Sequence, residues 1–151
     1  MGMDLVELWQ SKDPRKLCWK VYGVLEDGCC QVYDKFLELA QIEADRKRAG
    51  NLLQKIQHIA FNEDGPNLYT KDSKVCHEAI AGTGIYRLRK DQLRLYFFYD
   101  RDHVVICSLL LEKRKDKLSD AEEDRLIKIK QNYERTTHRF NIVKNKDYRR
   151  G

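Results

Sequence analysis

The order of hydrophobic and polar positions predicts one strand and two helices in the first part of the chain. Aromatic and β-branched residues are concentrated over Leu17–Val24, which is typical of a strand, and Glu26-Asp27-Gly28 marks a turn after it. Hydrophobic residues then recur at helical spacing from Val32 to Leu39. A second helix is expected from about Glu43 to His58, before the helix-breaking Asp64-Gly65-Pro66.

Three strands and a final helix are expected after a polar connection over 67–83. Two strands fall within Gly84–Asp100, and the continuous apolar run Val104–Leu111 predicts a central strand buried on both faces. Ser119 and Glu122 have the spacing of a capping box, which predicts a helix that runs to about Tyr133. We therefore expect a single domain over 1–151, with a core at about 16–133 and a basic tail at about 136–151.

The first two of these strands predict a hairpin with one charged face. If the connection holds an even number of residues, the hydrophobic side chains share one face and the polar side chains share the other. The hydrophobic face carries Leu88, Leu95 and Phe97. The polar face carries Arg87, Arg89, Arg94 and Tyr96.

In this register Arg89 lies directly opposite Arg94. Like charges that face each other across a sheet are destabilising, so the pair is more easily accepted where an anion such as a phosphate lies between them. A solvated face in a charged protein is the alternative interpretation.

Composition indicates a globular protein with a charged surface. The chain has 151 residues, of which 42% are hydrophobic and 35% are charged. No apolar run reaches the roughly 18 residues of a membrane span, and Met1–Trp9 does not resemble a secretion signal. Five cysteines without a CxxC pair argue against a disulfide framework or a zinc ribbon. A reduced, cytoplasmic location is expected.

Positive charge is concentrated near the C-terminus. From Lys113 onward there are 13 Lys and Arg against 7 Asp and Glu, a net +6, whereas the rest of the chain has a net −1. Such a distribution favours a polyanionic partner, although a basic tail that promotes solubility gives the same count. The run Lys113-Arg114-Lys115-Asp116-Lys117 follows the buried strand, where its cations can bind phosphates or form a solvated loop.

The sequence contains no metal-binding histidine motif, no glycine-rich phosphate loop and no nucleophile elbow. No metal and no cofactor are therefore expected. His77 is a candidate general acid or base, although a histidine in a loop is usually a surface residue.

Several of these segments together resemble the toxins of the RelE/ParE superfamily. The resemblance rests on Gly84–Arg89, on Leu93–Tyr99, on the apolar strand and on the basic pair Lys113-Arg114. Within this superfamily, the sequence is most similar to the HigB-like, phage-associated branch. It implies an α+β fold, in which two N-terminal helices and a C-terminal helix accompany a small twisted antiparallel sheet, with the two N-terminal helices packed on it.

The resemblance also implies a function. Such a protein is the toxin of a type II toxin-antitoxin system, a cytoplasmic and ribosome-dependent mRNA endoribonuclease that cleaves phosphodiesters without a metal. Its partners are a cognate antitoxin, mRNA and the ribosome. Arg89 and Arg94 would hold the scissile phosphate, Lys113 would assist the attacking hydroxyl, and Tyr96 would stack a base or donate a proton. The further RNA contacts would come from Arg87, Arg114, Lys115 and Lys117.

Two other functions are compatible with the same residues. A branch of the superfamily poisons DNA gyrase without catalysis. A RelE/ParE-like binding protein that has lost its toxicity is the third possibility, because Arg87 stands where the family often has Glu.

Overall fold

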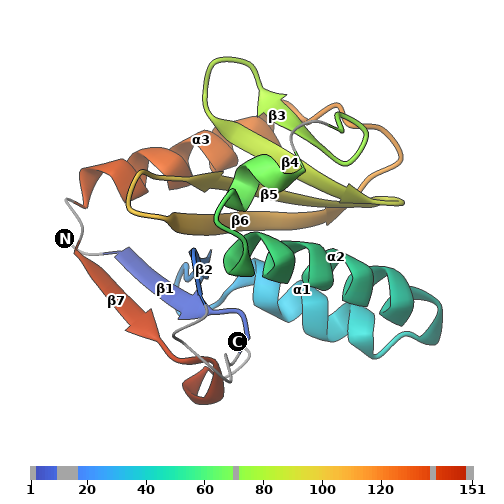
Figure 1. Ribbon diagram of the computed structural model, residues 1–151, viewed down its shortest axis with the longest axis horizontal. Coiled ribbons are helices and arrows are strands. Elements are labelled where there is room, and N and C mark those ends of the chain that lie inside the picture. Colours follow the sequence, from blue (N-terminus) through green and yellow to red (C-terminus); the bar gives the residue numbers. More distant parts are fainter. Residues whose placement is uncertain (1–2, 10–16, 70–71, 137–138, 149–151) are drawn as a thin grey trace.

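The computed structural model describes residues 3–9, 17–69, 72–136 and 139–148, which form a seven-stranded sheet with helices on both faces (Figure 1). The strands are β1 (Met3–Glu7), β2 (Lys20–Val24), β3 (Cys76–Ile80), β4 (Ile85–Lys90), β5 (Leu93–Tyr99), β6 (Val104–Glu112) and β7 (Phe140–Val143). The helices are α1 (Gln31–Ala40), α2 (Glu43–Phe61) and α3 (Asp120–Arg135), with short 3-10 turns η2 (Gly65–Leu68) and η3 (Asn145–Asp147).

The sheet is mixed, and its strand order is β3-β4-β5-β6-β2-β1-β7. Strand β2 lies parallel to β6 and β1 lies parallel to β7, whereas the other neighbours are antiparallel. The predicted central strand is confirmed as β6, the fourth of seven strands, which is buried from Val105 to Leu110. An uninterrupted apolar run suits this position because both faces of the strand are covered.

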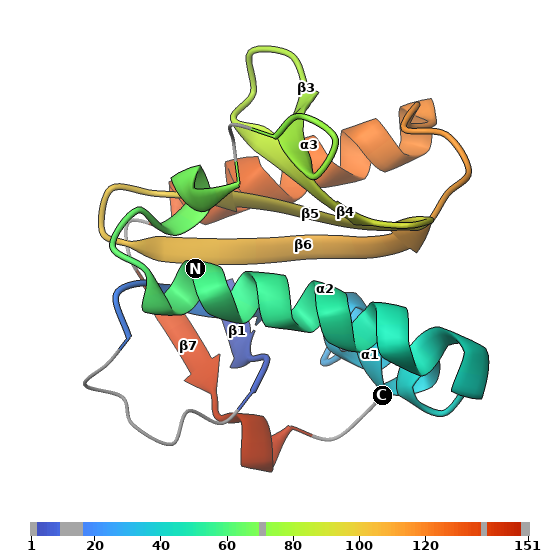
Figure 2. The same cartoon turned by 45° about the vertical axis from the view of Figure 1, so that its right-hand side comes forward.

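The two faces of the sheet carry different helices (Figure 2). Helices α1 and α2 lie together on one face, where Leu52 and Ile56 of α2 join Leu88 and Leu95 in the main core. Helix α3 lies on the other face, where Leu126 joins a second buried cluster. The boundaries of α1 and α2 agree closely with the helices predicted from spacing. The predicted capping box of Ser119 and Glu122 is also present at the start of α3.

The predicted RelE-like fold is wrong. The sheet is larger than predicted, and it is mixed rather than antiparallel. It has seven strands, and two of its strand pairs are parallel. The sequence predicted only four strands, one before the first two helices and three antiparallel strands after them. Parallel pairing depends on how the chain crosses over, which a local hydrophobic pattern does not specify. The C-terminal helix also covers the face opposite the two N-terminal helices.

Three strands account for most of this error. Strand β1 falls in the N-terminal segment, β3 in the expected polar connection and β7 in the expected basic tail. Each has only four or five residues, and β3 and β7 are edge strands with partly exposed side chains. Residues 137–138 and 149–151 of the predicted tail lie outside the described residues.

The β4–β5 hairpin has the predicted register. Asp91 and Gln92 alone connect the strands, and this even number places Arg89 opposite Arg94 and Leu88 opposite Leu95. Asp91 adopts a left-handed conformation with φ of 54°, which Asp tolerates better than most residues. This tight turn brings the polar face of the hairpin to the end of the sheet where β6 gives way to the loop before α3.

Candidate functional site

Five polar side chains from three strands share the α3 side of the sheet. The ladder pairs His77 of β3 with Arg87 of β4, Arg87 with Tyr96 of β5, and Arg89 with Arg94. Because side chains alternate across a strand, directly paired residues lie on the same face. Tyr96 belongs to the buried cluster that includes Leu126 of α3, which identifies the face.

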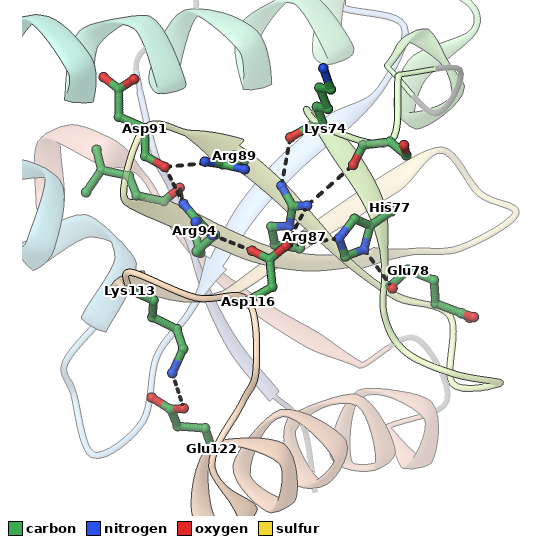
Figure 3. A network of polar contacts seen from close by, with 12 residues as sticks. Lys74, His77, Glu78, Arg87, Arg89, Asp91, Arg94, Lys113, Asp116 and Glu122 are labelled. Atoms are coloured by element: carbon green, nitrogen blue, oxygen red, sulfur yellow. Dashed lines mark hydrogen bonds and ion pairs between the residues drawn. The ribbon is translucent and has the colours of Figure 1, made fainter.

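Asp116, in the loop between β6 and α3, lies at the centre of this group (Figure 3). Its Oδ1 atom accepts a hydrogen bond from Arg94 Nε at 2.7 Å. Its Oδ2 atom accepts one from Arg87 Nη2 at 3.1 Å and lies 3.4 Å from His77 Nε2. One carboxylate thus bridges two arginines and a histidine. We refer to His77, Arg87, Arg94 and Asp116 as the arginine cluster.

The two arginines are far more buried than the carboxylate that pairs with them. The Arg87 and Arg94 side chains are each 2% exposed, whereas Asp116 is 40% exposed. Taking a guanidinium out of water is costly unless it is paired and hydrogen-bonded. Asp116 therefore covers two buried cations from the solvent side.

Backbone carbonyl groups supply most of the remaining partners of the arginines. Arg87 donates to the carbonyls of Lys74 and Ser73 at 3.1 and 3.4 Å, and these residues belong to the turn before β3. Arg94 donates to the carbonyl of Asp91 at 2.5 Å. The guanidinium groups are thereby held in fixed orientations before any ligand binds, which is the arrangement that favours recognition of an anion.

Positive charge exceeds negative charge in the arginine cluster. Burial lowers the pKa of Arg87; Asp116 opposes this shift, and the charges of Arg94 and Arg89 add to it. Burial alone would raise the pKa of the Asp116 carboxyl, but the hydrogen bond from Arg94 and the charge of Arg87 hold it below its usual range. Asp116 is therefore ionised at neutral pH, and one negative charge faces two buried positive charges.

Two buried polar atoms beside the arginine cluster lack a hydrogen-bond partner among the described residues. They are Arg87 Nε and the Tyr96 hydroxyl, whose residues face each other across β4 and β5. Burial raises the pKa of Tyr96 to about 12, so the hydroxyl retains its proton. Most buried polar groups are hydrogen-bonded, so these two atoms are exceptions on the face of the sheet that carries the arginine cluster.

His77 is oriented by the backbone. Its Nδ1 atom lies 2.9 Å from the Glu78 carbonyl oxygen, which can only accept, so Nδ1 carries a proton. In the neutral ring Nε2 is then an acceptor, and in the charged ring it donates toward Asp116. The side chain is 36% exposed, so solvent reaches it.

The other predicted site residues are more dispersed. Arg89 is exposed, and its Nε donates to the Asp91 carbonyl at 3.1 Å, the same oxygen that Arg94 contacts. Lys113 points away from Asp116 toward α3, where its Nζ lies 2.7 Å from Glu122 Oε1 (Figure 3). The side chains of Arg114, Lys115 and Lys117 are exposed on the loop that carries Asp116.

The structure thus brings Arg87, Arg89 and Arg94 together and leaves Lys113 paired elsewhere. Tyr96 is on the predicted face but is fully buried, so its ring is not open to a base. Asp116 was missed because it was read as part of a basic run, although a single acid among four cations was the available signal. His77 could not be placed because β3 was read as a polar connection.

Neither a metal site nor a membrane helix is seen in the part of the chain that the structure describes. None of the described residues form a group of three or more His, Cys, Asp and Glu that could hold a metal ion. Over the same residues, no helix has the length and apolar character needed to cross a lipid bilayer.

Comparisons with known proteins assign no family. No family model matches the chain, and no curated protein matches it.

Proposed function

We propose that this protein binds RNA by a backbone phosphate in the arginine cluster and cleaves the chain there without a metal ion. The observation that carries the proposal is the convergence of Arg87, Arg94 and His77 on one carboxylate position. A carboxylate and a phosphate both present two oxygens to a guanidinium, so Asp116 marks where the non-bridging phosphate oxygens would lie.

The arginines would act on charge that develops during cleavage. The RNA 2′-oxygen attacks the adjacent phosphorus, a 2′-O–P bond forms, and the bond from phosphorus to the 5′-oxygen breaks. Arg87 and Arg94 are already fixed by backbone carbonyls, so they can stabilise the added negative charge on the phosphorane without reorganising. Arg89, exposed at the edge of the same face, is placed to hold a neighbouring phosphate.

His77 is placed to move a proton. With Nδ1–H held by the Glu78 carbonyl, neutral Nε2 can accept the proton of the 2′-hydroxyl, while water supplies a proton to the leaving 5′-oxygen. The hydroxide that remains takes the proton from Nε2, which restores the neutral ring. The products would be a 2′,3′-cyclic phosphate and a 5′-hydroxyl.

The biological setting that we propose is a toxin-antitoxin pair in the cytoplasm, in which this chain cleaves mRNA on the ribosome. The concentration of positive charge from Lys113 onward supports a polyanionic partner. It equally suits a cognate antitoxin with an acidic segment, which would cover the arginine cluster and block RNA by charge complementarity. Co-purification with a neighbouring gene product tests this pairing.

Binding without catalysis is the second candidate function. It is favoured by Lys113, whose ammonium group is paired with Glu122 and therefore does not reach the phosphate position in this structure. A protein of this kind would hold RNA or another polyanion through the same arginines but would leave it intact.

Cleavage of a short RNA in the presence of EDTA, with and without ribosomes, separates the two functions. A matched RNA in which one ribose lacks its 2′-hydroxyl should bind equally well but resist cleavage at that position. Arg94→Ala should reduce cleavage about a hundredfold, on the order of 3 kcal/mol in transition-state stabilisation. Arg101→Ala, which removes an exposed cation from the β5–β6 turn, is the control and should have little effect.

The outcomes distinguish the candidates clearly. RNA binding that depends on Arg94, with no cleavage under either condition, would favour the non-catalytic function. Absence of RNA binding in the wild-type protein would contradict both.

A further inference from the structure

Asp116 lies on a loop that is anchored firmly at both ends but weakly in the middle. At the start, the Lys113 backbone N–H donates to the Gln92 carbonyl at 2.8 Å, which extends the β5–β6 ladder. At the end, Leu118 is buried and Ser119 caps α3. Residues 114–117 between these anchors are exposed and belong to no helix or strand.

Among the described residues, the side-chain contacts of Asp116 hold this middle section to the sheet. All three involve the arginine cluster, and its partners come from β3, β4 and β5. An external phosphate that bound Arg87, Arg94 and His77 would thus free Asp116 from the sheet. Both ends of the loop would stay anchored.

We propose that Asp116 is an internal anion that occupies the phosphate site, and that a phosphodiester must displace it in order to bind. This inference rests on the proposed function, because it assumes that the arginine cluster receives an RNA phosphate. The carboxylate keeps two buried guanidinium groups paired when no RNA is present. It competes for the same donors when RNA arrives, so it lowers the affinity of the free protein.

Displacement of Asp116 would also change which side chains of the loop can contact RNA. Arg114, Lys115 and Lys117 flank Asp116 and are exposed. Once the carboxylate has left the cluster, these three cations are free to follow the RNA backbone on either side of the bound phosphate. The loop would then exchange one internal ion-pair network for several contacts with RNA, and its release from the sheet would accompany binding.

A binding experiment with an RNA that cannot be cleaved tests this inference. The probe is a short single-stranded RNA methylated at every 2′-oxygen, and its dissociation constant is measured for each variant at one fixed salt concentration. Asp116→Asn keeps an oxygen that can accept from Arg94 but removes the competing charge. It should bind the probe about tenfold or more tightly than the wild type.

Two variants control for charge and for folding. Asp124→Asn removes an exposed carboxylate from α3, and its affinity should change much less than that of Asp116→Asn. Asp116→Glu keeps the anion in the loop and should stay close to the wild type. Inorganic phosphate should also raise the melting temperature of Asp116→Asn more than that of the wild type at equal ionic strength.

A measurement on the wild-type protein covers the case in which Asp116→Asn does not fold. The carboxylate carbon of Asp116 should give an NMR signal that moves toward that of a solvent-exposed Asp as the RNA probe saturates. An unchanged signal with RNA bound would overturn the inference. So would equal affinity of the wild type and Asp116→Asn when Arg94→Ala abolishes binding, and in that case the proposed function would still stand. If neither the wild type nor any variant binds the probe, both this inference and the proposed function are wrong.

Discussion

Arg94 Nε and Asp116 Oδ1 lie 2.7 Å apart, in the shortest of the contacts that join the loop before α3 to the sheet. The two residues are 22 positions apart in the sequence, and one is almost fully buried while the other is half-exposed. Their pairing places the half-exposed carboxylate of Asp116 over a buried guanidinium of the β4–β5 hairpin.

The first prediction concerns stability. Arg94→Ala should lower the free energy of unfolding by about 1–3 kcal/mol, because it leaves the carboxylate without its closest donor and removes a buried side chain. The estimate is below that for a fully buried pair because Asp116 is 40% exposed. Urea denaturation measures the change. Arg101→Ala, at an exposed turn, should shift stability by no more than about 0.5 kcal/mol. Equal effects of the two variants would show that the ion pair is not a structural anchor.

A second prediction concerns pH. The pKa of Asp116 is lowered in the folded protein, as are the pKa values of Glu112 and Glu122, each of which is hydrogen-bonded to a lysine or an arginine. Such groups contribute stability that is fully present above their unfolded pKa of about 4 and is lost as the pH falls through the folded value. The free energy of unfolding should therefore fall between about pH 5 and pH 2. In Asp116→Asn this fall should be shallower, and an unchanged slope would contradict the contribution of Asp116.

The third prediction concerns the hydroxyl of Tyr96, which has no hydrogen-bond partner among the described residues. Tyr96→Phe should leave stability unchanged or slightly increased, because no described hydrogen bond is lost and a buried polar atom is removed. RNA cleavage by the same variant should also be unchanged, because the hydroxyl is fully buried and water supplies the proton to the leaving oxygen in the proposed mechanism. A marked loss of stability would instead show that the hydroxyl is bonded within the protein, for example through water.

The fourth prediction concerns the start of α3. Ser119→Ala should destabilise the protein by about 1 kcal/mol, since the Ser119 side chain accepts from the Glu122 N–H in a complete capping box. Asp124→Asn, also on α3 but outside the cap, provides the comparison for thermal unfolding. If both variants unfold at the same temperature, the cap contributes nothing measurable.

Much of the local structure was predictable because it depends on neighbours in the sequence. The helical spacing of Val32 and Leu39, the capping box of Ser119 and the apolar run of β6 each specify an element without reference to the rest of the fold. The hairpin register was predictable for the same reason, since a two-residue turn and side-chain alternation together place Arg89 opposite Arg94.

The remaining features depend on contacts between distant segments. Strand β7 is stabilised by parallel pairing with β1, and Met3 and Phe140 are partners although almost the whole chain separates them. Asp116 reaches the site because the loop before α3 folds back over β4 and β5, and no periodicity in the run of cations encodes that path. His77 joins it only because the short strand β3 pairs with β4.

The most direct test of the proposed function is an NMR titration that observes the arginine Nε–H groups while the 2′-O-methylated RNA is added. We predict that the Arg94 and Arg87 signals shift and saturate at the same RNA concentration, and that the signal of Arg101 does not move. The Arg94 signal is well suited to this because its Nε–H is bonded to Asp116 in the free protein. Binding of the RNA with both cluster signals unchanged, or no binding at all, would contradict the account.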